Sequence, residues 1–566
     1  MQVLPDKFNS FFVNKISDIR SSLDSYDINN VFDDHVFDGK PLNVFSPVST
    51  TYVRNIIMTS KKSFCELDSL PRDMFIHCID ILLPFITTIF NDSLSDGIFP
   101  NDFKDCLVTP LIKKSGLDCN ILKNYRPVSN LSFISKVLER IVFKQIVNHL
   151  QENCLFDKLQ SAYRSGHSTE TALLKVVNDI VCDIDNGNVS FLTMLDLSAA
   201  FDTIDHKILF HRLSNTFGIN DTVLNWFKSY LHGRYQRVKI CDHYSSDVPV
   251  VYGIPQGSVL GPLIFLMYIF PISDVVNIND FSYHQYADDM QLYTSCKPDS
   301  VMQAADKITS TTSLINDWMS ANKLKMNNDK TEIILCGTNP KRKLVNIDSI
   351  DIGDVNVALS SEVKDLGVMI DSGFSFNKHV SFLRRSCYYQ IRRISNIRPF
   401  ISVQSAKSLA VSLILSKLDY CNSLFFDMSD ENFNALQLLQ NHAARVVLKA
   451  KRDCSATALL KELHWLPVRQ RVLYKIALIV FKCLHFTDFP SYLKDLVVLH
   501  KPSKFLRSGD KHLLQKPFKK LHFGNKCLHY SAPHVWNDLP LKIRATTCFT
   551  MFKRLLKTHF FRIAFN

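Results

Sequence analysis

The spacing of apolar residues along the chain predicts where helices form. Between residues 129 and 151 Ser132 stands where a helix cap would, and the apolar side chains fall on one helical face, at positions 134, 137, 138, 141, 142, 145 and 146. We interpret this face as core packing. The same periodicity predicts a buried helix at 81–94, with a proline inside it, an amphipathic helix at 301–322 and mostly helical structure over 375–450.

Alternation and turn residues predict the extended segments. FLTMLDLSAAF (191–201) begins as an apolar strand, and TEIILC (331–336) and VKDLGVMID (363–371) each have the pattern of a strand. SYHQYADDMQLYTS (282–295) combines the alternation and the turn chemistry of a β-hairpin. VYGIPQGSVLGPLIFLMYIFPI (251–272) is a Gly/Pro-rich loop that leads into a helix.

Positive charge is concentrated near the end of the chain. Residues 451–566 contain 22 Lys and Arg against 6 Asp and Glu, whereas residues 1–450 contain 44 against 48. Such asymmetry favours a polyanionic partner, because neutralising phosphates releases their counterions. Solubility alone is the alternative explanation. The length of 566 residues suggests three or four domains, and 46% apolar residues argue against wholesale disorder.

Cysteine usage and hydropathy exclude several classes of protein. The 15 cysteines are scattered and no CxxC pair occurs, which argues against zinc ribbons and knuckles. An odd cysteine count without a signal peptide predicts reduced thiols in an intracellular compartment. The most apolar stretch, LIFLMYIF (263–270), is too short to span a bilayer, so we expect no membrane partner.

Two acidic positions have the setting that phosphoryl transfer requires. Asp196 ends the apolar strand in LDLSAAFD, and Asp288 and Asp289 lie at the predicted hairpin tip in YADD. Two convergent carboxylate sites suffice to hold a pair of hard divalent ions, and adjacent carboxylates repel one another unless a cation is present. The alternative for YADD is an ordinary turn, in which Asp is common. Asp205 is better explained as a helix cap, and Asp202 as either a solvated residue or a support for the metal ligands.

The order of the motifs resembles a known family. NYRPVSNLSFISKVLERIV, QSAYRSGHSTETAL, FLTMLDLSAAFDTIDH, GIPQGSVLGPLIF, YADD, LKMNNDKTEIIL and VKDLGV follow one another over about residues 100–370. This series resembles the reverse transcriptase of non-LTR retrotransposons. LDYCNSL (418–424), ELHWLPVRQRVLYK (462–475) and SAPHVWNDLPLKIR (531–544) resemble the C-terminal region of its chicken-repeat and jockey-like branch.

The resemblance implies a fold, a reaction and partners. The fold class is α+β, a right-hand polymerase with fingers, an antiparallel-sheet palm, a helical thumb and a basic C-terminal domain. The reaction is RNA-directed DNA polymerisation with two Mg²⁺ ions, for which Mn²⁺ could substitute, and the partners are an RNA template, a DNA primer and dNTPs. The implied domains are an N-terminal helical extension (1–99), fingers (100–190), palm (191–372), thumb (373–450) and basic domain (451–566).

The resemblance also assigns roles around the metals and the nucleotide. Asp196, Asp288 and Asp289, with the backbone carbonyl of Leu197, would hold the metals, and Lys330 would protonate the leaving pyrophosphate. Phe201, five residues after Asp196, would be the gate that excludes a ribose 2′-OH; core packing is the alternative. The remaining nucleotide contacts would be Lys113, Arg126, Gln256 and Gly257.

Each of these roles has a simpler alternative. Lys113 and Arg126 would grip the triphosphate or belong to a solvated basic surface. PQG, with Pro255 stiffening the turn, would contact the nascent base pair or be an ordinary loop before a helix. Lys330 is otherwise a surface lysine.

A further group of residues is expected to contact template or primer. These are Gln160, Arg164 and Ser168 on the template backbone and Leu366 and Gly367 in a primer-gripping hairpin, for which an ordinary strand end is the alternative. The basic and aromatic tail is expected to bind RNA, although 551–562 has the pattern of an amphipathic helix that packs on the thumb.

Other interpretations of the whole chain remain open. An apurinic-type endonuclease normally precedes the polymerase in this branch; we find no motif for one and expect it to be supplied by an upstream region or another protein. For such a retrotransposon protein we expect the nucleus and the cytoplasm as locations. The rival functions are a catalytically inert RNA-binding remnant or co-opted scaffold, and an RNA-dependent RNA polymerase, which Phe201 disfavours.

Overall fold

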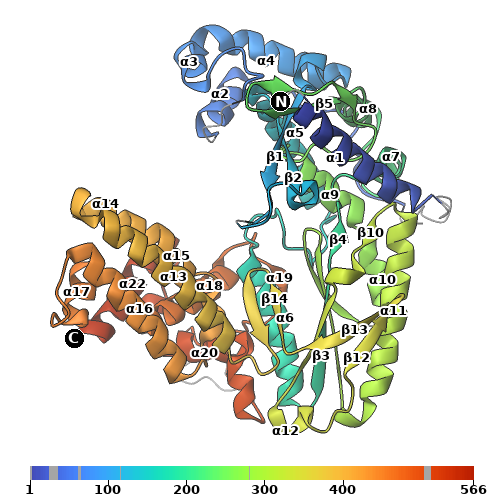
Figure 1. Cartoon of the computed structure of the whole chain (residues 1–566). Helices are drawn as coiled ribbons and strands as arrows, with labels where there is room; N and C mark the ends of the chain where they lie inside the picture. The colour runs from blue at the N-terminus through green and yellow to red at the C-terminus, as the bar shows by residue number, and fades with distance from the viewer. Residues whose placement is uncertain (1–2, 25–35, 61–64, 115, 279–280, 502–511) are drawn as a thin grey trace. The chain divides into compact units, whose positions relative to one another are not determined.

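The computed structural model describes residues 3–24, 36–60, 65–114, 116–278, 281–501 and 512–566. Tertiary contacts divide the chain into two units, each made of three separate segments of the sequence (Figure 1). Unit 1 comprises Met1–Asp157, Asp196–Asn279 and Thr311–Asn327, and unit 2 comprises Lys158–Leu195, Asp280–Ser310 and Asn328–Asn566. The chain therefore passes from one unit to the other several times.

Unit 1 contains a five-stranded sheet surrounded by helices. In this sheet β1 (Cys106–Ile112) pairs antiparallel with β2 (Tyr125–Asn130) and parallel with β5 (Tyr235–Ile240), which also pairs with β6 (His243–Tyr244) and β7 (Val248–Pro249). The helices are α1 (Val3–Ser21), α2 (Thr50–Thr59), α3 (Arg72–His77), α4 (Ile79–Asp96), α5 (Phe133–Glu152), α7 (His206–Asn215), α8 (Asp221–Leu231), α9 (Gly261–Ile269) and α10 (Ile272–Ile278). A short pair, β4 (Leu197–Ser198) and β10 (Lys325–Met326), completes the unit.

Helix α5 forms as its sequence predicts. The Ser132 hydroxyl caps it by accepting a hydrogen bond from the Ser135 N–H, and its apolar face is buried. Glu139 on this helix is fully buried, and one of its carboxylate oxygens accepts hydrogen bonds from the N–H groups of Val259 (2.6 Å) and Leu260 (3.1 Å). These two N–H groups precede α9, so the carboxylate anchors the start of that helix. Burial raises the pKa of Glu139, while these hydrogen bonds oppose the rise.

Helix α4 is formed as predicted, with Pro84 inside it, but only one of its faces is buried. Leu83, Ile86 and Phe90 lie in the interior, whereas Ile81 and Phe85 are 72% and 68% exposed. The prediction of a helix was therefore right and the prediction of general burial was wrong. The apolar residues of this segment occupy more of the helix circumference than the neighbouring elements cover.

One stretch of unit 1 is apolar enough to resemble a membrane span. Gly261–Ile278 meets the criteria of length and composition, but 61% of it is buried inside the protein. The core helices of globular proteins meet the same criteria, so this stretch is weak evidence for a membrane segment.

Unit 2 is built on a six-stranded sheet with the order β12-β13-β11-β3-β9-β8. Its strands are β3 (Val189–Leu195), β8 (Ser282–Tyr286), β9 (Asp289–Cys296), β11 (Glu332–Cys336), β12 (Ser349–Ile352) and β13 (Val355–Ser360). All neighbours run antiparallel except β11 and β13. Helix α6 (Thr169–Asp185) packs on this sheet, and its Asp179 and Asp183 accept hydrogen bonds from Tyr293 and Ser295 of β9.

The predicted strand at 363–371 is in fact a second hairpin. It consists of β14 (Glu362–Asp365) and β15 (Val368–Asp371), joined by Leu366 and Gly367. Both joining residues have positive φ, 41° and 89°, a backbone conformation that glycine adopts without strain. The single strand predicted from alternation was therefore wrong, whereas the hairpin that the family resemblance implied at Leu366 and Gly367 is present. Its grip on a primer stays a prediction.

The rest of unit 2 is helical. Its principal helices are α13 (Asn377–Ile397), α14 (Val403–Ala410), α15 (Ser416–Leu418), α16 (Asp430–Leu448), α17 (Ala456–Glu462), α18 (Val468–His485), α19 (Ser491–Lys494), α20 (Leu528–Asn537), α21 (Leu541–Arg544) and α22 (Phe549–Phe565). α12 (Asn339–Arg342) is a single turn, and α11 (Val301–Ala321) contributes residues to both units. A π-helical turn, Val411–Leu415, joins α14 to α15.

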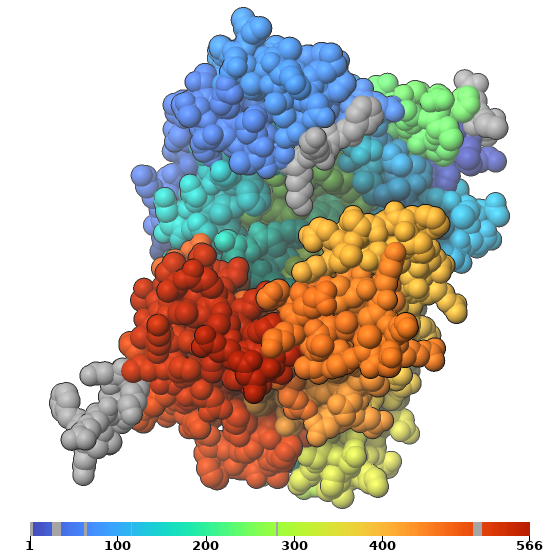
Figure 2. Space-filling model, turned by 90° about the vertical axis from the view of Figure 1, so that its left-hand side faces the viewer, coloured from blue at the N-terminus to red at the C-terminus, as the bar shows by residue number. Residues whose placement is uncertain are grey.

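One hydrophobic core runs through unit 2. It includes α6, strands β3 and β11, the helices of 377–448 and those of the tail, and Figure 2 shows the orange and red segments packed side by side. Helix α22 buries Phe552, Leu556 and Phe560, as predicted for an amphipathic helix at 551–562. The predicted boundary between residues 450 and 451 is not a boundary of this core. Helices and mixed sheets together confirm the α+β fold class.

A buried acid joins hairpin β14–β15 to the main sheet. Asp365 is 0% exposed, and its Oδ1 accepts a hydrogen bond of 2.7 Å from Nε2 of Gln291 on β9. Among the described residues, neither Oδ2 of Asp365 nor Oε1 of Gln291 has a hydrogen-bond partner. Burial, together with the charge of Asp289, raises the pKa of Asp365 to about 8, although the Gln291 hydrogen bond opposes the rise. A protonated Oδ2 would be a donor suited to Oε1.

We predict that Asp365→Asn stabilises the protein at high pH. The folded-state pKa of Asp365 lies above the unfolded value of 3.8, so its contribution to stability falls as pH rises from about 4 to about 8. Asparagine stays neutral and its amide can donate to Gln291. The melting temperature of the variant should exceed that of wild type at pH 8.5 by about 2–4 °C per kcal/mol gained, and the difference should shrink toward pH 5.

The matched control is Asp354→Asn, at an exposed turn between β12 and β13. This variant should melt as wild type does at both pH values. A constant difference between Asp365→Asn and wild type across pH would contradict the assignment of a protonated Asp365.

Candidate active site

The register of unit 2 brings two strand ends together where the sequence carries its acids. Leu195, the last residue of β3, pairs with Met290, and Tyr286 pairs with Asp289 across the β8–β9 turn. Asp196 follows Leu195 directly, so its Cα lies about 3.8 Å beyond the end of β3. Asp289 directly precedes Met290. The predicted acids thus stand at adjoining ends of paired strands, as the hairpin interpretation requires.

The turn that carries Asp288 is held by a buried glutamine. Ala287 has a φ of 59°, which is unusual for a residue other than glycine. The Gln160 side chain accepts hydrogen bonds from the Ala287 N–H (2.9 Å) and the Ala162 N–H (3.0 Å), and it donates to the Ala287 carbonyl and to Oε1 of Gln285 (both 3.3 Å). Gln160 is 4% exposed. This geometry makes Gln160 a support of the turn and does not favour its predicted contact with a template.

A chain of hydrogen bonds supports the same hairpin from the tail. The Ser161 hydroxyl lies 2.8 Å from Nε2 of His284 on β8 and 2.6 Å from the Tyr492 hydroxyl on α19. Tyr492 in turn donates to the Thr171 hydroxyl at 3.2 Å. Burial lowers the pKa of His284 to about 3, so the imidazole is neutral. The chain is complete when the neutral imidazole donates to Ser161 and each hydroxyl donates onward.

Asp196 belongs to unit 1, where the residue after β10 positions it. The Asp196 carbonyl accepts a hydrogen bond of 2.9 Å from the Asn327 N–H, and its Oδ2 accepts one of 3.3 Å from Nδ2 of Asn327. Leu197, the predicted carbonyl ligand, pairs with Met326. In unit 2, Lys330 ends the turn Asn328–Lys330 and is exposed. Its predicted role as a proton donor stays a prediction.

Phe201 lies in unit 1 against the loop that contains PQG. Its ring stacks on Phe265 of α9, with centroids 4.7 Å apart, and it is half-buried. Its carbonyl accepts a hydrogen bond from the Ile254 N–H (3.0 Å), and the Ile204 carbonyl accepts one from the Gly253 N–H (2.9 Å). The Phe201 ring is therefore fixed both by the backbone hydrogen bond of its residue and by stacking on Phe265. This arrangement is compatible with a steric gate for the nucleotide sugar and also with simple core packing.

Gln256 is oriented by Asp202. Its Nε2 lies 2.7 Å from each carboxylate oxygen of Asp202, and burial raises the pKa of Asp202 to about 6 despite this hydrogen bond. Asp202 therefore supports Gln256, a role that was not among those considered, and its support of the metal ligands stays a prediction. Gly257 has a φ of 118°, and a Cβ there would lie 2.5 Å from the Ser129 carbonyl, so the glycine allows the loop to approach β2. Asp205 caps α7 and also pairs with Arg20, as the cap interpretation predicted.

The predicted phosphate contacts lie on the β1–β2 hairpin. Arg126 is exposed on β2 opposite Leu111, and Lys113 follows β1. Nζ of Lys113 donates a hydrogen bond of 2.7 Å to the Lys123 carbonyl. Both cations are at the surface of unit 1, and their grip on a triphosphate stays a prediction.

The other predicted nucleic-acid contacts have structural partners in unit 2. Ser168 caps α6 in a capping box with Thr171, and a guanidinium N–H of Arg164 donates to the Gln160 carbonyl at 2.8 Å. The Leu366 carbonyl accepts a hydrogen bond of 2.6 Å from the Tyr420 hydroxyl, and a Cβ on Gly367 would lie 3.3 Å from the same ring. Tyr420 thus fixes the turn of the predicted primer hairpin, a contact that the sequence did not reveal.

The donor chemistry of the strand ends fits a hard divalent ion. Carboxylates at adjoining strand ends supply the oxygen ligands that Mg²⁺ prefers, and the charge of Asp289 is strong enough to influence buried Asp365. Over the described residues, however, no group of three or more His, Cys, Asp or Glu side chains is arranged to hold a metal. The register of unit 2 sets Leu195 opposite Met290, and the convergence of the neighbouring acids on specific ions is a proposal.

Comparison with known proteins identifies the family of this domain. Residues 112–370 match the family described as reverse transcriptase (RNA-dependent DNA polymerase), whose members use divalent metals generally. The chain is 26% identical over 398 residues to a probable RNA-directed DNA polymerase from transposon BS of Drosophila melanogaster. The aligned region covers 69% of this chain and 43% of that protein.

Two further Drosophila melanogaster proteins are similarly related. A probable RNA-directed DNA polymerase from transposon X-element is 27% identical, covering 70% of this chain and 42% of its own length, and the RNA-directed DNA polymerase from mobile element jockey is 24% identical, covering 65% and 40%. The chain thus spans less than half the length of these relatives. The match in family and the relatives together confirm the resemblance seen in the ordered motifs: residues 112–370 match the reverse transcriptase family, and the chain is similar to the RNA-directed DNA polymerases of transposon BS, the X-element and mobile element jockey.

Proposed function

We propose that this chain copies RNA into DNA by adding dNTPs to a primer 3′-OH. The observation that carries the proposal is the pairing of Leu195 with Met290, which sets Asp196 and Asp289 at adjoining ends of β3 and β9. Phosphoryl transfer depends on positioning and on the neutralisation of charge, both of which carboxylates held on rigid strands can provide through bound ions.

Asp196, Asp288 and Asp289, with the Leu197 carbonyl, are the groups that would hold two Mg²⁺ ions, or Mn²⁺ in their place. When bound, such ions activate the primer hydroxyl and stabilise the leaving oxygen. The chain's own residues orient these ligands. Gln160 fixes the turn that carries Asp288, and Asn327 fixes both the carbonyl and the carboxylate of Asp196.

Unit 1 supplies the groups proposed for the incoming nucleotide. Phe201 would exclude a ribose, and Gln256, held by Asp202, would face the nascent base pair. Lys113 and Arg126 would contact the triphosphate. Lys330, on unit 2, would protonate the leaving pyrophosphate. The relatives' description as RNA-directed DNA polymerases supports an RNA template. The family resemblance further implies the element's own RNA as that template and a nicked DNA end as primer, with the endonuclease provided by an upstream region or by another protein.

Asp288→Asn is expected to abolish primer extension. The substitution keeps the size of the side chain and removes the charge that would bind the ions. Purified protein should extend a DNA primer on an RNA template with dNTPs and Mg²⁺ or Mn²⁺, and the variant should not. The control is Asp299→Asn, at an exposed turn of the same unit, which should retain full activity.

Full activity of Asp288→Asn would refute the metal assignment. RNA binding by the wild-type protein without primer extension would instead support the inert RNA-binding alternative.

Phe201→Val is expected to increase the use of ribonucleotides. A smaller side chain would remove the steric barrier to a 2′-OH and should raise the ratio of rNTP to dNTP incorporation by about tenfold, equivalent to about 1.4 kcal/mol of discrimination. Single-nucleotide insertion kinetics with dCTP and CTP measure this ratio. Phe201→Tyr keeps the ring and should behave as wild type, whereas an unchanged ratio in Phe201→Val would remove the gate.

Gln160→Ala is expected to slow catalysis without weakening nucleic-acid binding. The substitution removes the side-chain hydrogen bonds to Ala287, so Asp288 loses its fixed position, and kcat should fall by about tenfold or more. The Kd for a primer–template should stay unchanged, which distinguishes turn support from template contact. Gln303→Ala, at an exposed position of α11, is the control. A raised Kd at unchanged kcat would restore the predicted template contact.

A further inference from the structure

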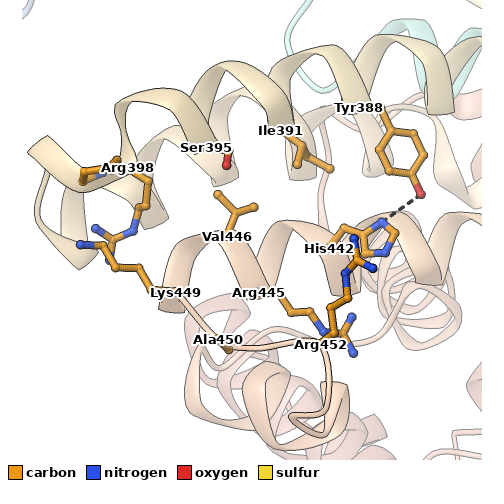
Figure 3. Close-up of a pocket in the computed structure, with 11 residues that line it drawn as sticks. Tyr388, Ile391, Ser395, Arg398, His442, Arg445, Val446, Lys449, Ala450 and Arg452 are labelled. Carbon is orange, nitrogen blue, oxygen red and sulfur yellow. Dashed lines mark hydrogen bonds between the residues drawn. The ribbon is translucent and has the colours of Figure 1, made fainter.

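A groove lies between helices α13 and α16 of unit 2. It has a volume of about 890 Å³, and Figure 3 shows its side chains reaching into the space between the two helices. Tyr388 and Arg398 come from α13 and the turn that follows it, His442 and Arg445 from α16, and Arg452 from the loop after α16. Helix α13 contacts β15 of the β14–β15 hairpin and begins at Asn377. At a rise of about 1.5 Å per residue, Tyr388 lies about 16 Å along the helix from Asn377.

The groove is positively charged. Four cations line it, Arg398, Arg445, Lys449 and Arg452, and no Asp or Glu is among its lining residues. The segment 377–418, which includes α13, contains eight Lys or Arg and no Asp or Glu. Carboxylates thus do not offset the charge from within the groove or from the segment that forms one of its walls.

The four cations differ in how far the fold already uses them. Arg398 is buried and donates to the carbonyls of Val447 (3.0 Å) and Ile401 (2.7 Å), so it joins the ends of the two helices. Arg445 donates weakly to the Cys454 carbonyl at 3.4 Å, and its buried Nε has no hydrogen-bond partner in the described part of the chain. Because this Nε is closed to solvent, an anion in the groove would meet the terminal N–H groups of the guanidinium, one of which makes the weak contact with Cys454.

The electrostatic environment of His442 agrees with this charge. Burial lowers the pKa of His442, and the charges of Arg445 and Arg452 lower it further. The Tyr388 hydroxyl lies 3.1 Å from Nδ1 of His442, and the two rings are 5.6 Å apart between centroids. The groove therefore places two rings beside several cations. Aromatic rings adjacent to cations suit the bases and the phosphates of a single strand.

We propose that the groove between α13 and α16 binds the phosphodiester backbone of single-stranded RNA. Arg445, Lys449 and Arg452 contact the phosphates, Tyr388 and His442 contact bases, and Arg398 holds the helices together. The choice of RNA rests on the proposed function, whereas the charge of the groove does not. The site is separate from the strand ends that carry the catalytic acids, so it would retain a strand during synthesis without taking part in the chemistry.

The test is an RNA-binding measurement on the full chain with Arg445→Gln, Lys449→Gln and Arg452→Gln combined. Arg398 is kept because the fold uses it. Fluorescence anisotropy with a labelled RNA of about 16 nucleotides should show Kd raised about tenfold, and the slope of log K against log salt reduced by about 2, since each lost phosphate contact removes about 0.7. This groove variant and its control are both made in the Asp288→Asn background, so the measured RNA binding does not depend on catalysis.

The charge-matched control replaces three lysines of unit 2 that lie outside both the groove and the tail, Lys297→Gln, Lys341→Gln and Lys343→Gln, and should leave the salt slope unchanged. An equal loss in both triple variants, or no loss in the groove variant, would overturn the proposal. Equal competition by polyglutamate at matched charge would overturn it in favour of an acidic protein partner. Arg452→Glu, a single change in the loop, repeats the test should the triple variant fail to fold, and should also weaken binding.

A second version of the groove variant keeps Asp288 so that extension can be measured. Loss of RNA binding together with normal extension of a short primer–template by this version would support the groove as a separate site. Failure of primer extension in the wild-type protein would refute the proposed function and leave the binding result intact. The two proposals are therefore distinguishable.

Discussion

The antiparallel pairing of β3 with β9 is the constraint on which the site depends. Its register sets Leu195 opposite Met290, and a shift of one residue would turn every side chain of the shifted strand to the other face of the sheet. The pairing is reinforced because β11 adds to the other edge of β3 and α6 contacts β9 through Tyr293 and Ser295. Acids that repel one another are thus positioned by strands whose stability comes from sheet pairing and from contacts with α6.

Local patterns predicted the elements that carry the acids, and long-range contacts account for what was missed. Alternation around YADD was enough to predict the hairpin, and Ser132 and Asp205 were recognisable as helix caps. Gln160 was assigned to the template from the family resemblance of its segment. The residue that it supports, Ala287, lies 127 positions away, and no local pattern reports such a partner. Gln256 and Asp202, 54 positions apart, are a similar case.

Counting charge over long segments concealed where the basic surface lies. The balance of residues 1–450 is slightly negative, yet this region contains the segment 377–418, which has eight cations and no acid. The acids of the earlier residues cancel them in the sum. The tail, which holds the numerical excess, instead buries much of its apolar surface in the common core through residues such as Trp536 and Phe552. The position of each cation in the fold, and not the total charge of its segment, determines whether it lines the groove between α13 and α16.

The hydroxyl of Tyr492 links the hairpin that carries the acids to a distant part of unit 2. It accepts a hydrogen bond from Ser161, which in turn accepts one from His284 on β8, so two buried polar side chains depend on a residue 331 positions from Ser161. Without that hydroxyl the buried Ser161 would lose the acceptor it donates to. Part of the rigidity of the centre therefore originates in helix α19, which carries Tyr492.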